Sequence, residues 1–262
     1  MKIVKQLVVA FTLLIFASCG NQENKSTNDT FEPHKITIAT AANMQFAMEK
    51  LTNEFTKQTG IKCELVISSS GKLTAQIKEG APYDVFIAAN MKYPEEIYNS
   101  GLAENQPQIY AYGKLVLWSM VEGIEVSLEL LQENSIHHIA LANPKTAPYG
   151  LAATEVLNHH SIYKKVESKL VFGESIAQTN QFITSKSAEI GFTAMSVVLS
   201  PEMKDKGKWI EIDKSTYTPI EQGVVVVKHN EHSNKSAIKF YEFLFSEKAK
   251  DILTNFGYAI NE

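Results

Sequence analysis

Arginine is absent from this sequence of 262 residues, so all 25 of its basic side chains are lysines. The acidic residues number 29, and the formal net charge at pH 7 is −4 with histidine neutral. Proteins that bind nucleic acids carry basic patches and usually contact phosphates and bases through arginine. The composition therefore argues against nucleic acid as a partner. It also indicates that a bound anion would be held by neutral donors rather than by cationic side chains.

Cysteine is nearly absent as well, since the chain contains only Cys19 and Cys63. Cys19 falls in an N-terminal segment that we expect to precede the folded domain. Cys63 is then the single cysteine of that domain, and no internal disulfide can form there. Because Cys63 alternates with apolar neighbours over residues 61–67, we interpret it as a buried core thiol.

The chain has no apolar run long enough for a transmembrane helix, which needs about 20 residues. Its N-terminal apolar run covers residues 7–16 and follows Lys2 and Lys5. A basic start, a short apolar stretch and small residues at its end are typical of a secretory signal. We therefore expect a signal peptide over residues 1–18 and an exported protein.

Residues 16–19, Phe-Ala-Ser-Cys, resemble the lipobox of bacterial lipoproteins, although Phe replaces the usual first Leu. That resemblance implies that Cys19 is lipidated and becomes the mature N-terminus. The alternative is an ordinary signal with a chance cysteine. Residues 19–33 are mostly polar and predict a lipid-anchored disordered tether, so the protein would face the periplasm or the cell exterior from a membrane.

Motifs of enzymes and of metal centres are also missing. The chain contains neither a Gly-x-Ser-x-Gly motif nor a P-loop. Two histidine pairs, at residues 137–138 and 159–160, are adjacent in sequence, so their side chains diverge on a helix or a strand. We therefore expect no enzyme activity, no cofactor and no direct metal ligand. A serine hydrolase that uses a serine of residues 68–70 remains a weaker alternative.

The rest of the chain alternates strand-like and helix-like segments, which is typical of an α/β fold with mostly parallel sheets. Strand-like runs lie at residues 35–42, 63–67, 84–89, 115–118, 139–142, 170–172, 190–193 and 223–227. Helix-like patterns follow Asn43, Ser70, Pro148 and Ser175, and a terminal helix is expected over residues 236–256. The strands at 115–118 and 223–227 bracket an inner α/β set, which predicts two lobes joined by two connecting strands. Lobe 1 would comprise residues 34–112 plus 220–262, and lobe 2 residues 113–219.

At four places a strand-like or small-residue run ends in a polar tip from which a helix begins. The tips are Asn43, Ser70, Tyr149-Gly150 and Ser175-Ile176. A helix start presents unpaired N–H groups and about half a positive charge, so four starts give nominally about +2. Ligands of open α/β sheets bind beyond the carboxyl ends of strands, where all four tips are expected. The pattern predicts a site for a doubly charged anion.

Each tip offers a particular donor. Asn43 is expected at a helix N-cap, with an amide that could instead donate to a ligand. Ser70 supplies a hydroxyl, Tyr149 a backbone N–H and a phenol, and Ile176 its backbone N–H alone. Three neighbours are possible additional contacts: Ala42, Ser69 and Ser175.

Several segments resemble the periplasmic molybdate-binding proteins of molybdate ABC transporters, which are type II periplasmic binding proteins. The similar segments are Ala-Ala-Asn at 41–43, Ser-Ser-Gly at 69–71, Gly-Ala-Pro-Tyr-Asp-Val-Phe at 80–86, Asn-Pro at 143–144 with Ala-Pro-Tyr-Gly at 147–150, Gly-Glu-Ser-Ile at 173–176 and Glu-Ile-Gly-Phe at 189–192. The resemblance implies two lobes with a two-strand hinge, capture of molybdate and also tungstate, and delivery to an ABC permease by a monomer. It also implies that Asn43, Ser70, Tyr149 and Ile176 bind the oxyanion, so that the metal is held only as its oxyanion.

The resemblance has one gap, because some members carry a tyrosine donor where this chain has Ala194. The Tyr149 phenol is a candidate replacement. A pocket lined by donors favours anions without a proton, such as molybdate, tungstate or sulfate, over phosphate, which is partly protonated at neutral pH. Glu174 would disturb such a site if it pointed inward, and we expect it to face solvent or to cap its own helix. The alternatives are a binder of another oxyanion such as sulfate, and a structural or signalling lipoprotein with a vestigial site.

Overall fold

The computed structural model describes residues 35–229 and 234–260. The expected signal peptide, Cys19 and the tether lie outside the described residues. Within the described ranges, no helix is long and apolar enough to cross a membrane.

The first of two sheets has five strands, and β10 is the one that runs opposite to the other four. Strand β1 pairs in parallel with β2 and β3, whereas β10 pairs antiparallel with β3 and with β4. In spatial order the strands are β2 (Lys62–Ser68), β1 (Lys35–Ala41), β3 (Val85–Ala88), β10 (Ile220–Val226) and β4 (Gln108–Gly113).

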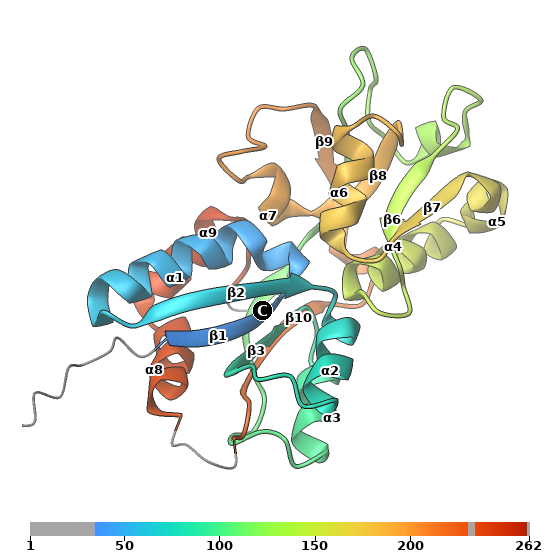
Figure 1. The fold of residues 1–262 in the computed structure, drawn as a ribbon. Helices are drawn as coiled ribbons and strands as arrows, with labels where there is room; N and C mark the ends of the chain where they lie inside the picture. The colour runs from blue at the N-terminus through green and yellow to red at the C-terminus, as the bar shows by residue number, and fades with distance from the viewer. Residues whose placement is uncertain (1–34, 230–233, 261–262) are drawn as a thin grey trace, which may run out of the picture. The chain divides into compact units, whose positions relative to one another are not determined.

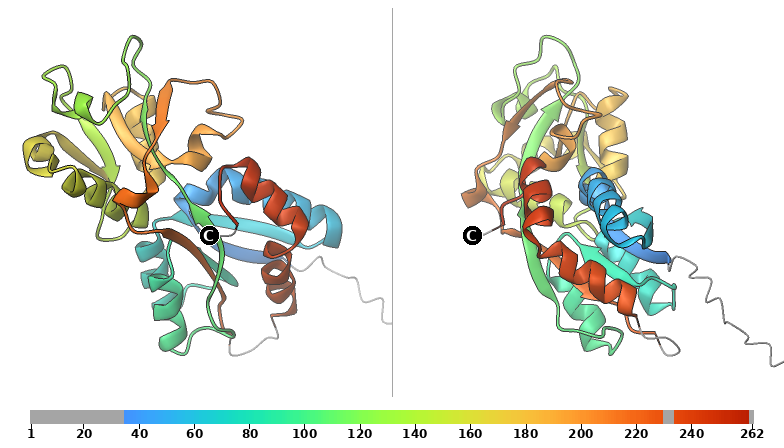
Figure 2. Two further views of the ribbon diagram at one scale, coloured as in Figure 1. Left: turned by 180° about the vertical axis from the view of Figure 1, so that it is seen from behind. Right: turned by 90° about the vertical axis from the view of Figure 1, so that its left-hand side faces the viewer.

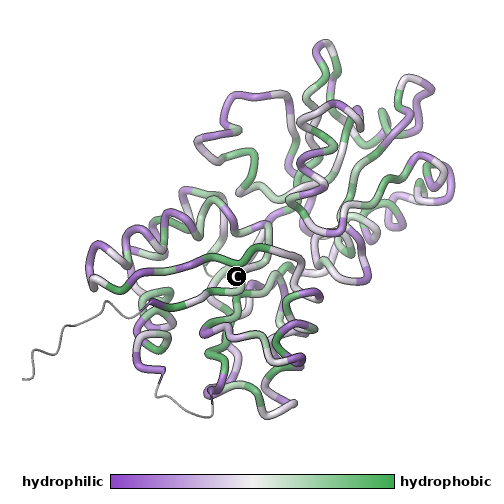
Figure 3. The backbone as a smooth tube through the Cα atoms, viewed as in Figure 1, coloured by the Kyte–Doolittle hydropathy of each residue, from purple (hydrophilic) through white to green (hydrophobic). Residues whose placement is uncertain are grey.

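Helices cover both faces of this sheet because its strands are apolar on both sides. On β3, Val85 and Ile87 join one buried cluster, and Phe86 and Ala88 join another. The first cluster is closed by α1 (Gln45–Thr59), α8 (Lys235–Leu244) and α9 (Glu247–Asn255), and the second by α2 (Ser70–Lys78) and α3 (Lys92–Asn99), as Figure 1 shows. Along α1 the tube of Figure 3 alternates between hydrophilic and hydrophobic colour, as expected for a helix with one face on a core.

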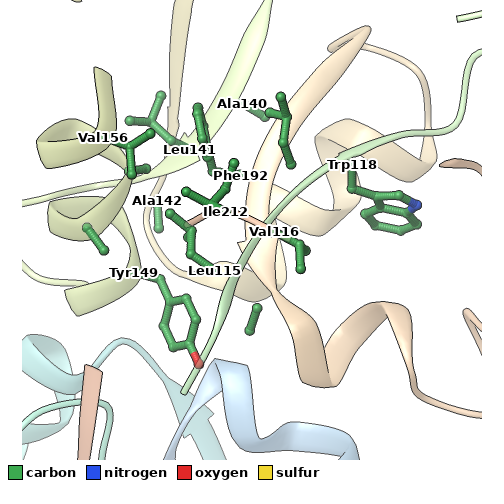
Figure 4. Close-up of a cluster of buried hydrophobic side chains, with 14 of the residues drawn as sticks. Leu115, Val116, Trp118, Ala140, Leu141, Ala142, Tyr149, Val156, Phe192 and Ile212 are labelled. Atoms are coloured by element: carbon green, nitrogen blue, oxygen red, sulfur yellow. The ribbon is translucent and has the colours of Figure 1, made fainter. Parts of the chain in front are cut away.

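The second sheet repeats this plan, with β5 opposite in direction to its four companions. In spatial order its strands are β7 (Leu170–Gly173), β6 (Ile139–Ala142), β8 (Ile190–Ala194), β5 (Leu115–Ser119) and β9 (Lys208–Glu211). Its helices are α4 (Pro148–His159), α5 (Tyr163–Val166), α6 (Ile176–Thr184) and α7 (Met195–Val198). Four short 3-10 helices complete the described elements: η1 (Ala42–Met44), η2 (Glu129–Gln132), η3 (Glu167–Lys169) and η4 (Lys214–Thr216). Figure 4 shows the buried cluster of this lobe, with Phe192, Leu141 and Val156 among its members.

The chain crosses between the two sheets twice, which Figure 2 lets the reader follow from behind. The first crossing is Lys114, the single residue between β4 and β5. The second is the segment 212–219 between β9 and β10, which contains η4. The fold is therefore the predicted α/β type with two lobes and two connections, and each sheet has four of its five strands in one direction. The strands at 115–118 and 223–227, which were expected to connect the lobes, instead lie within the sheets as parts of β5 and β10.

One expected element differs. The terminal helix predicted over residues 236–256 is two helices, because Ser246 is extended (φ −71°, ψ 154°) and begins a new helix. Its hydroxyl accepts the Ala249 N–H at 3.2 Å, a standard N-cap. The exact lobe boundaries stay a prediction.

Candidate functional site

The four predicted tips line one pocket between the lobes. The first lobe contributes η1 with the end of β1, the N-terminus of α2 and the residue after β3, and the second lobe contributes the N-termini of α4 and α6. The lining residues are Ala41, Ala42, Asn43, Ser69, Ser70, Ala89, Ala147, Pro148, Tyr149 and Ile176. Of the seven residues named from the sequence as possible oxyanion contacts, six are therefore together and Ser175 is not part of the lining. Gly150 of the third tip does not line it either.

Every residue of this lining is uncharged. The cavity is small, ≈ 10 Å³, about the space that one water needs. Such a space excludes an organic solute, and a tetrahedral oxyanion with four oxygens would need the lining to move outward. A larger hollow of ≈ 670 Å³ lies at the hinge near Lys114 and Tyr217, and none of the predicted site residues lines it.

Ser69 offers the pocket a free hydroxyl. It is the N-cap residue of α2 with φ −74° and ψ 150°, nearly the same backbone as Ser246. Ser246 caps its helix, but the Ser69 hydroxyl does not, and its oxygen is buried without a hydrogen-bond partner. A buried hydroxyl without a partner costs free energy, so this one calls for a ligand or a bound water.

Ser70 is the first residue of α2 and is also buried. Its Oγ accepts the Ala89 backbone N–H at 3.0 Å. That bond fixes the hydroxyl against the end of β3. Since a hydroxyl has one hydrogen to give, Ser70 can still donate it into the pocket.

The start of α4 follows from its sequence. Pro148 is the first helical residue, where the missing N–H costs nothing. The Tyr149 N–H lies in that first turn, where helix amides have no intrahelical acceptor. Gly150 must be glycine, because a Cβ there would lie 2.0 Å from the Ala142 carbonyl oxygen. The chain can thus bring the helix start directly onto the end of β6.

The Tyr149 phenol extends away from the core of its lobe, as Figure 4 shows. Its oxygen is buried without a partner and would lie 2.1 Å from a Cβ at Gly113, the last residue of β4. Burial, and then the nearby Tyr258 phenol, raise the pKa of Tyr149 well above its usual value. The phenol is therefore a neutral donor at the junction of the lobes.

Ile176 is the first residue of α6 and is buried. Its N-cap residue, Ser175, is extended and makes no side-chain cap. The apolar Ile176 side chain cannot contact an anion favourably, so the backbone N–H is the group it can offer, as the sequence predicts.

Asn43 differs from its prediction as an N-cap. It is the middle residue of η1, and α1 begins only at Gln45. Its side-chain amide donates to Gln222 Oε1 at 2.8 Å and to Tyr258 Oη at 3.0 Å. Both amide hydrogens are thereby used, so the donor that Asn43 retains for an anion is its backbone N–H. The side-chain amide of Asn43 thus bonds to residues distant in sequence and not to a nearby helix amide.

Two contacts join the lobes beside the pocket. The Gly71 N–H donates to the Thr146 carbonyl oxygen at 2.9 Å. The Lys72 ammonium pairs with the Glu174 carboxylate, and both side chains are substantially exposed. Glu174 thus neither lines the pocket nor caps α6, and the lysine charge nearest the helix start of α2 is matched by an acid.

Other candidates from the sequence do not form sites. Cys63 is half-buried against the core of the first lobe and not fully buried as predicted, and this burial raises the pKa of its thiol to about 11. Over residues 35–229 and 234–260, no three His, Cys, Asp or Glu side chains come together as a metal ion would require. Among the residues that line the pocket there is no histidine or carboxylate, so neither Ser69 nor Ser70 has a general base there.

Sequence reasoning missed three residues that surround Asn43: Ser196, Gln222 and Tyr258. They lie far from Asn43 in sequence, and nothing local marks them.

The chain is similar to known solute-binding proteins in sequence. Residues 36–259 match the family model of the bacterial extracellular solute-binding proteins. The chain is 35% identical to the molybdate-binding protein ModA of Azotobacter vinelandii, over 86% of this chain and 90% of that protein. It is 34% identical to the ModA protein of Rhodobacter capsulatus, over 86% of this chain and 88% of the relative.

A solved structure agrees. The periplasmic molybdate-binding protein of Azotobacter vinelandii superposes with a TM-score of 0.81 at 34% sequence identity, covering 87% of this chain and 100% of that one. The likeness therefore spans both lobes and the pocket between them.

Proposed function

Because the chain belongs to the bacterial extracellular solute-binding proteins and, within them, to the molybdate-binding proteins, we propose that it captures molybdate between its lobes for an ABC permease. Tungstate has the same charge and shape and is the expected second ligand. The metal enters as its oxyanion, without a direct metal–protein bond. No bond is made or broken, and the chain needs no cofactor.

The observation that carries this proposal is the uncharged, donor-lined pocket shared by two lobes. The proposed contacts are the Ser69 and Ser70 hydroxyls and the backbone N–H groups of Asn43, Tyr149 and Ile176. Hydrogen bonds to a charged group contribute about 1.5–3 kcal/mol each, and several together can offset the desolvation of a dianion. Since each lobe supplies donors, the ion is fully bound only when the lobes are closed on it.

The same lining argues for selectivity. A protonated oxyanion such as hydrogen phosphate brings a donor that needs an acceptor, and the lining side chains include no carboxylate. Burying that proton without an acceptor costs free energy. Molybdate, tungstate and sulfate have no such proton. Sulfate is smaller than molybdate and is the remaining competitor.

Further assignments rest on the sequence and are part of the proposal. Residues 1–18 act as the signal peptide, and Cys19 anchors the mature protein to a membrane through a lipid. Residues 34–112 with 220–262 form lobe 1, and residues 113–219 form lobe 2. The protein works as a monomer outside the cytoplasm.

Calorimetric titration of the protein lacking residues 1–19 with molybdate, tungstate, sulfate and phosphate tests the function. We expect tight binding of molybdate and tungstate, weaker binding of sulfate and none of phosphate. Heat from sulfate that molybdate cannot displace would make this a sulfate binder instead. No response to molybdate or tungstate would refute the proposed ligand.

A serine hydrolase is tested in parallel, since an activated ester would acylate a reactive serine in the pocket. Mass spectrometry after incubation with such an ester should show an unmodified chain. An acyl group on Ser69 or Ser70 would contradict the transport function.

A further inference from the structure

Behind the anion pocket lies a buried polar ring that joins the two lobes. It consists of Asn43 and Tyr258 with Gln222 from the first lobe and Ser196 from α7 of the second, and all four are nearly inaccessible to solvent. None of the four is charged. The ring is therefore distinct from the exposed Lys72–Glu174 ion pair beside the pocket.

The hydrogen bonds of the ring centre on one peptide. The Asn43 carbonyl oxygen accepts the Ser196 hydroxyl at 2.7 Å and the Tyr258 hydroxyl at 3.0 Å. The two hydroxyls lie 3.1 Å apart, and the Asn43 amide donates to Tyr258 and Gln222. Asn43 is thus held from one lobe by its side chain and from both lobes by its carbonyl.

We propose that Ser196 is a positioning residue that links lobe closure to the anion site through the Asn43 carbonyl. This inference rests on the proposed function. Ser196 does not line the pocket, so it acts on the ion only through Asn43. Its hydroxyl reaches that carbonyl only while the lobes are together, because α7 belongs to the second lobe and η1 to the first.

The physical effect is on the stability of the closed state. When the lobes are apart, water satisfies both the Ser196 hydroxyl and the Asn43 carbonyl, and when they meet the two groups satisfy each other. An intramolecular hydrogen bond of this kind has a modest net value. The bond also fixes the η1 turn, so it holds the Asn43 N–H in its orientation toward the ion in the closed state.

Removing the hydroxyl should therefore loosen the closed complex and leave the encounter with the ion unchanged. In the Ser196→Ala variant we expect molybdate to dissociate about 3- to 10-fold faster, with an association rate within about 2-fold of wild type. Stopped-flow kinetics of intrinsic fluorescence separates the two rates. The order of preference among the four anions should not change, because no contact to the ion is removed.

Ser200→Ala is the matched control. Ser200 is a fully buried serine of the same lobe, two residues after α7, and its hydroxyl accepts the Met203 N–H within that lobe. Its loss is expected to lower the unfolding temperature and to leave the molybdate dissociation rate as in wild type. A dissociation rate of Ser196→Ala equal to that of wild type would overturn the proposal, as would an equal rise in both variants.

Small-angle scattering of the proteins without ligand keeps this test separate from the proposed function. A larger radius of gyration for Ser196→Ala than for wild type and Ser200→Ala supports the link between the lobes whichever anion is the ligand. If wild type binds none of the four anions, the proposed function fails. The scattering comparison then decides the role of Ser196, and equal radii would refute it.

Discussion

Replacing Ser69 and Ser246 separately by alanine distinguishes a ligand-binding serine from a structural one. The two serines occupy the same N-cap position with almost the same backbone angles. Only Ser246 accepts a helix amide, whereas the Ser69 hydroxyl is buried without a partner. The two substitutions therefore compare a free hydroxyl with a capping hydroxyl on nearly the same backbone geometry.

The expected effects have opposite patterns. Ser246→Ala loses an N-cap bond and should cost about 1 kcal/mol of stability, or roughly 2–4 °C in unfolding temperature for a chain of this size. Ser69→Ala loses no bond in the ligand-free protein and removes an unsatisfied group, so its unfolding temperature should stay the same or rise slightly. Its molybdate affinity should instead fall about 10- to 150-fold, the equivalent of one hydrogen bond to a charged ligand.

The assay is thermal unfolding without ligand together with calorimetric titration with molybdate, for both variants and wild type. Normal affinity of Ser69→Ala would show that its hydroxyl does not contact the ion. A fall in its unfolding temperature as large as that of Ser246→Ala would show that the Ser69 hydroxyl has a structural partner.

Substitutions at three other positions test the contacts around the pocket. Gly71→Ala should strengthen α2, because alanine favours a helix more than glycine does. It should also weaken molybdate binding about 5- to 10-fold in calorimetry, because its Cβ would lie 3.1 Å from Thr146 and strain the hydrogen bond from the Gly71 N–H to the Thr146 carbonyl. Unchanged affinity would contradict this. Ile176→Val should bind almost normally and Ile176→Pro at least 10-fold more weakly, and equal affinities would rule out the backbone N–H as the donor. Lys72→Gln should lower affinity less than about 5-fold at low salt, with no difference at 0.5 M salt, since its ion pair with Glu174 is exposed; a large effect at high salt would make Lys72 a ligand.

The helix starts could be predicted from the sequence because the signals for them are local. Pro148 followed by Tyr149 and Gly150 predicts a helix start after a strand, and the structure places Pro148 at the first helical position. Ser70 and Ile176 likewise begin the helices expected after them. Parallel strands carry such starts to one edge of each sheet, which is why six of the seven named residues share a pocket.

Asn43 could not be placed in the same way. Its amide is satisfied by Gln222 and Tyr258, 179 and 215 residues away in the chain. Contacts at such separations leave no local pattern, and the capping preference of asparagine pointed to a bond that the fold does not use. The helices α3, α5 and α7 and the strands β4 and β9 were not predicted from the sequence either. The fold class did not depend on them.

The division of donors between the lobes also explains why the pocket needs no formal positive charge. A buried cation in each lobe would repel its counterpart on closing and would have to be desolvated before the ion arrived. Backbone N–H groups at helix starts carry partial charges that are fixed in direction and already partly desolvated. Closing the lobes then brings these donors together with little repulsion between them. The Lys72–Glu174 ion pair joins the two lobes beside the pocket and adds no net charge there. The strongest remaining interaction is with the dianion itself, so ion binding and closure favour the same state.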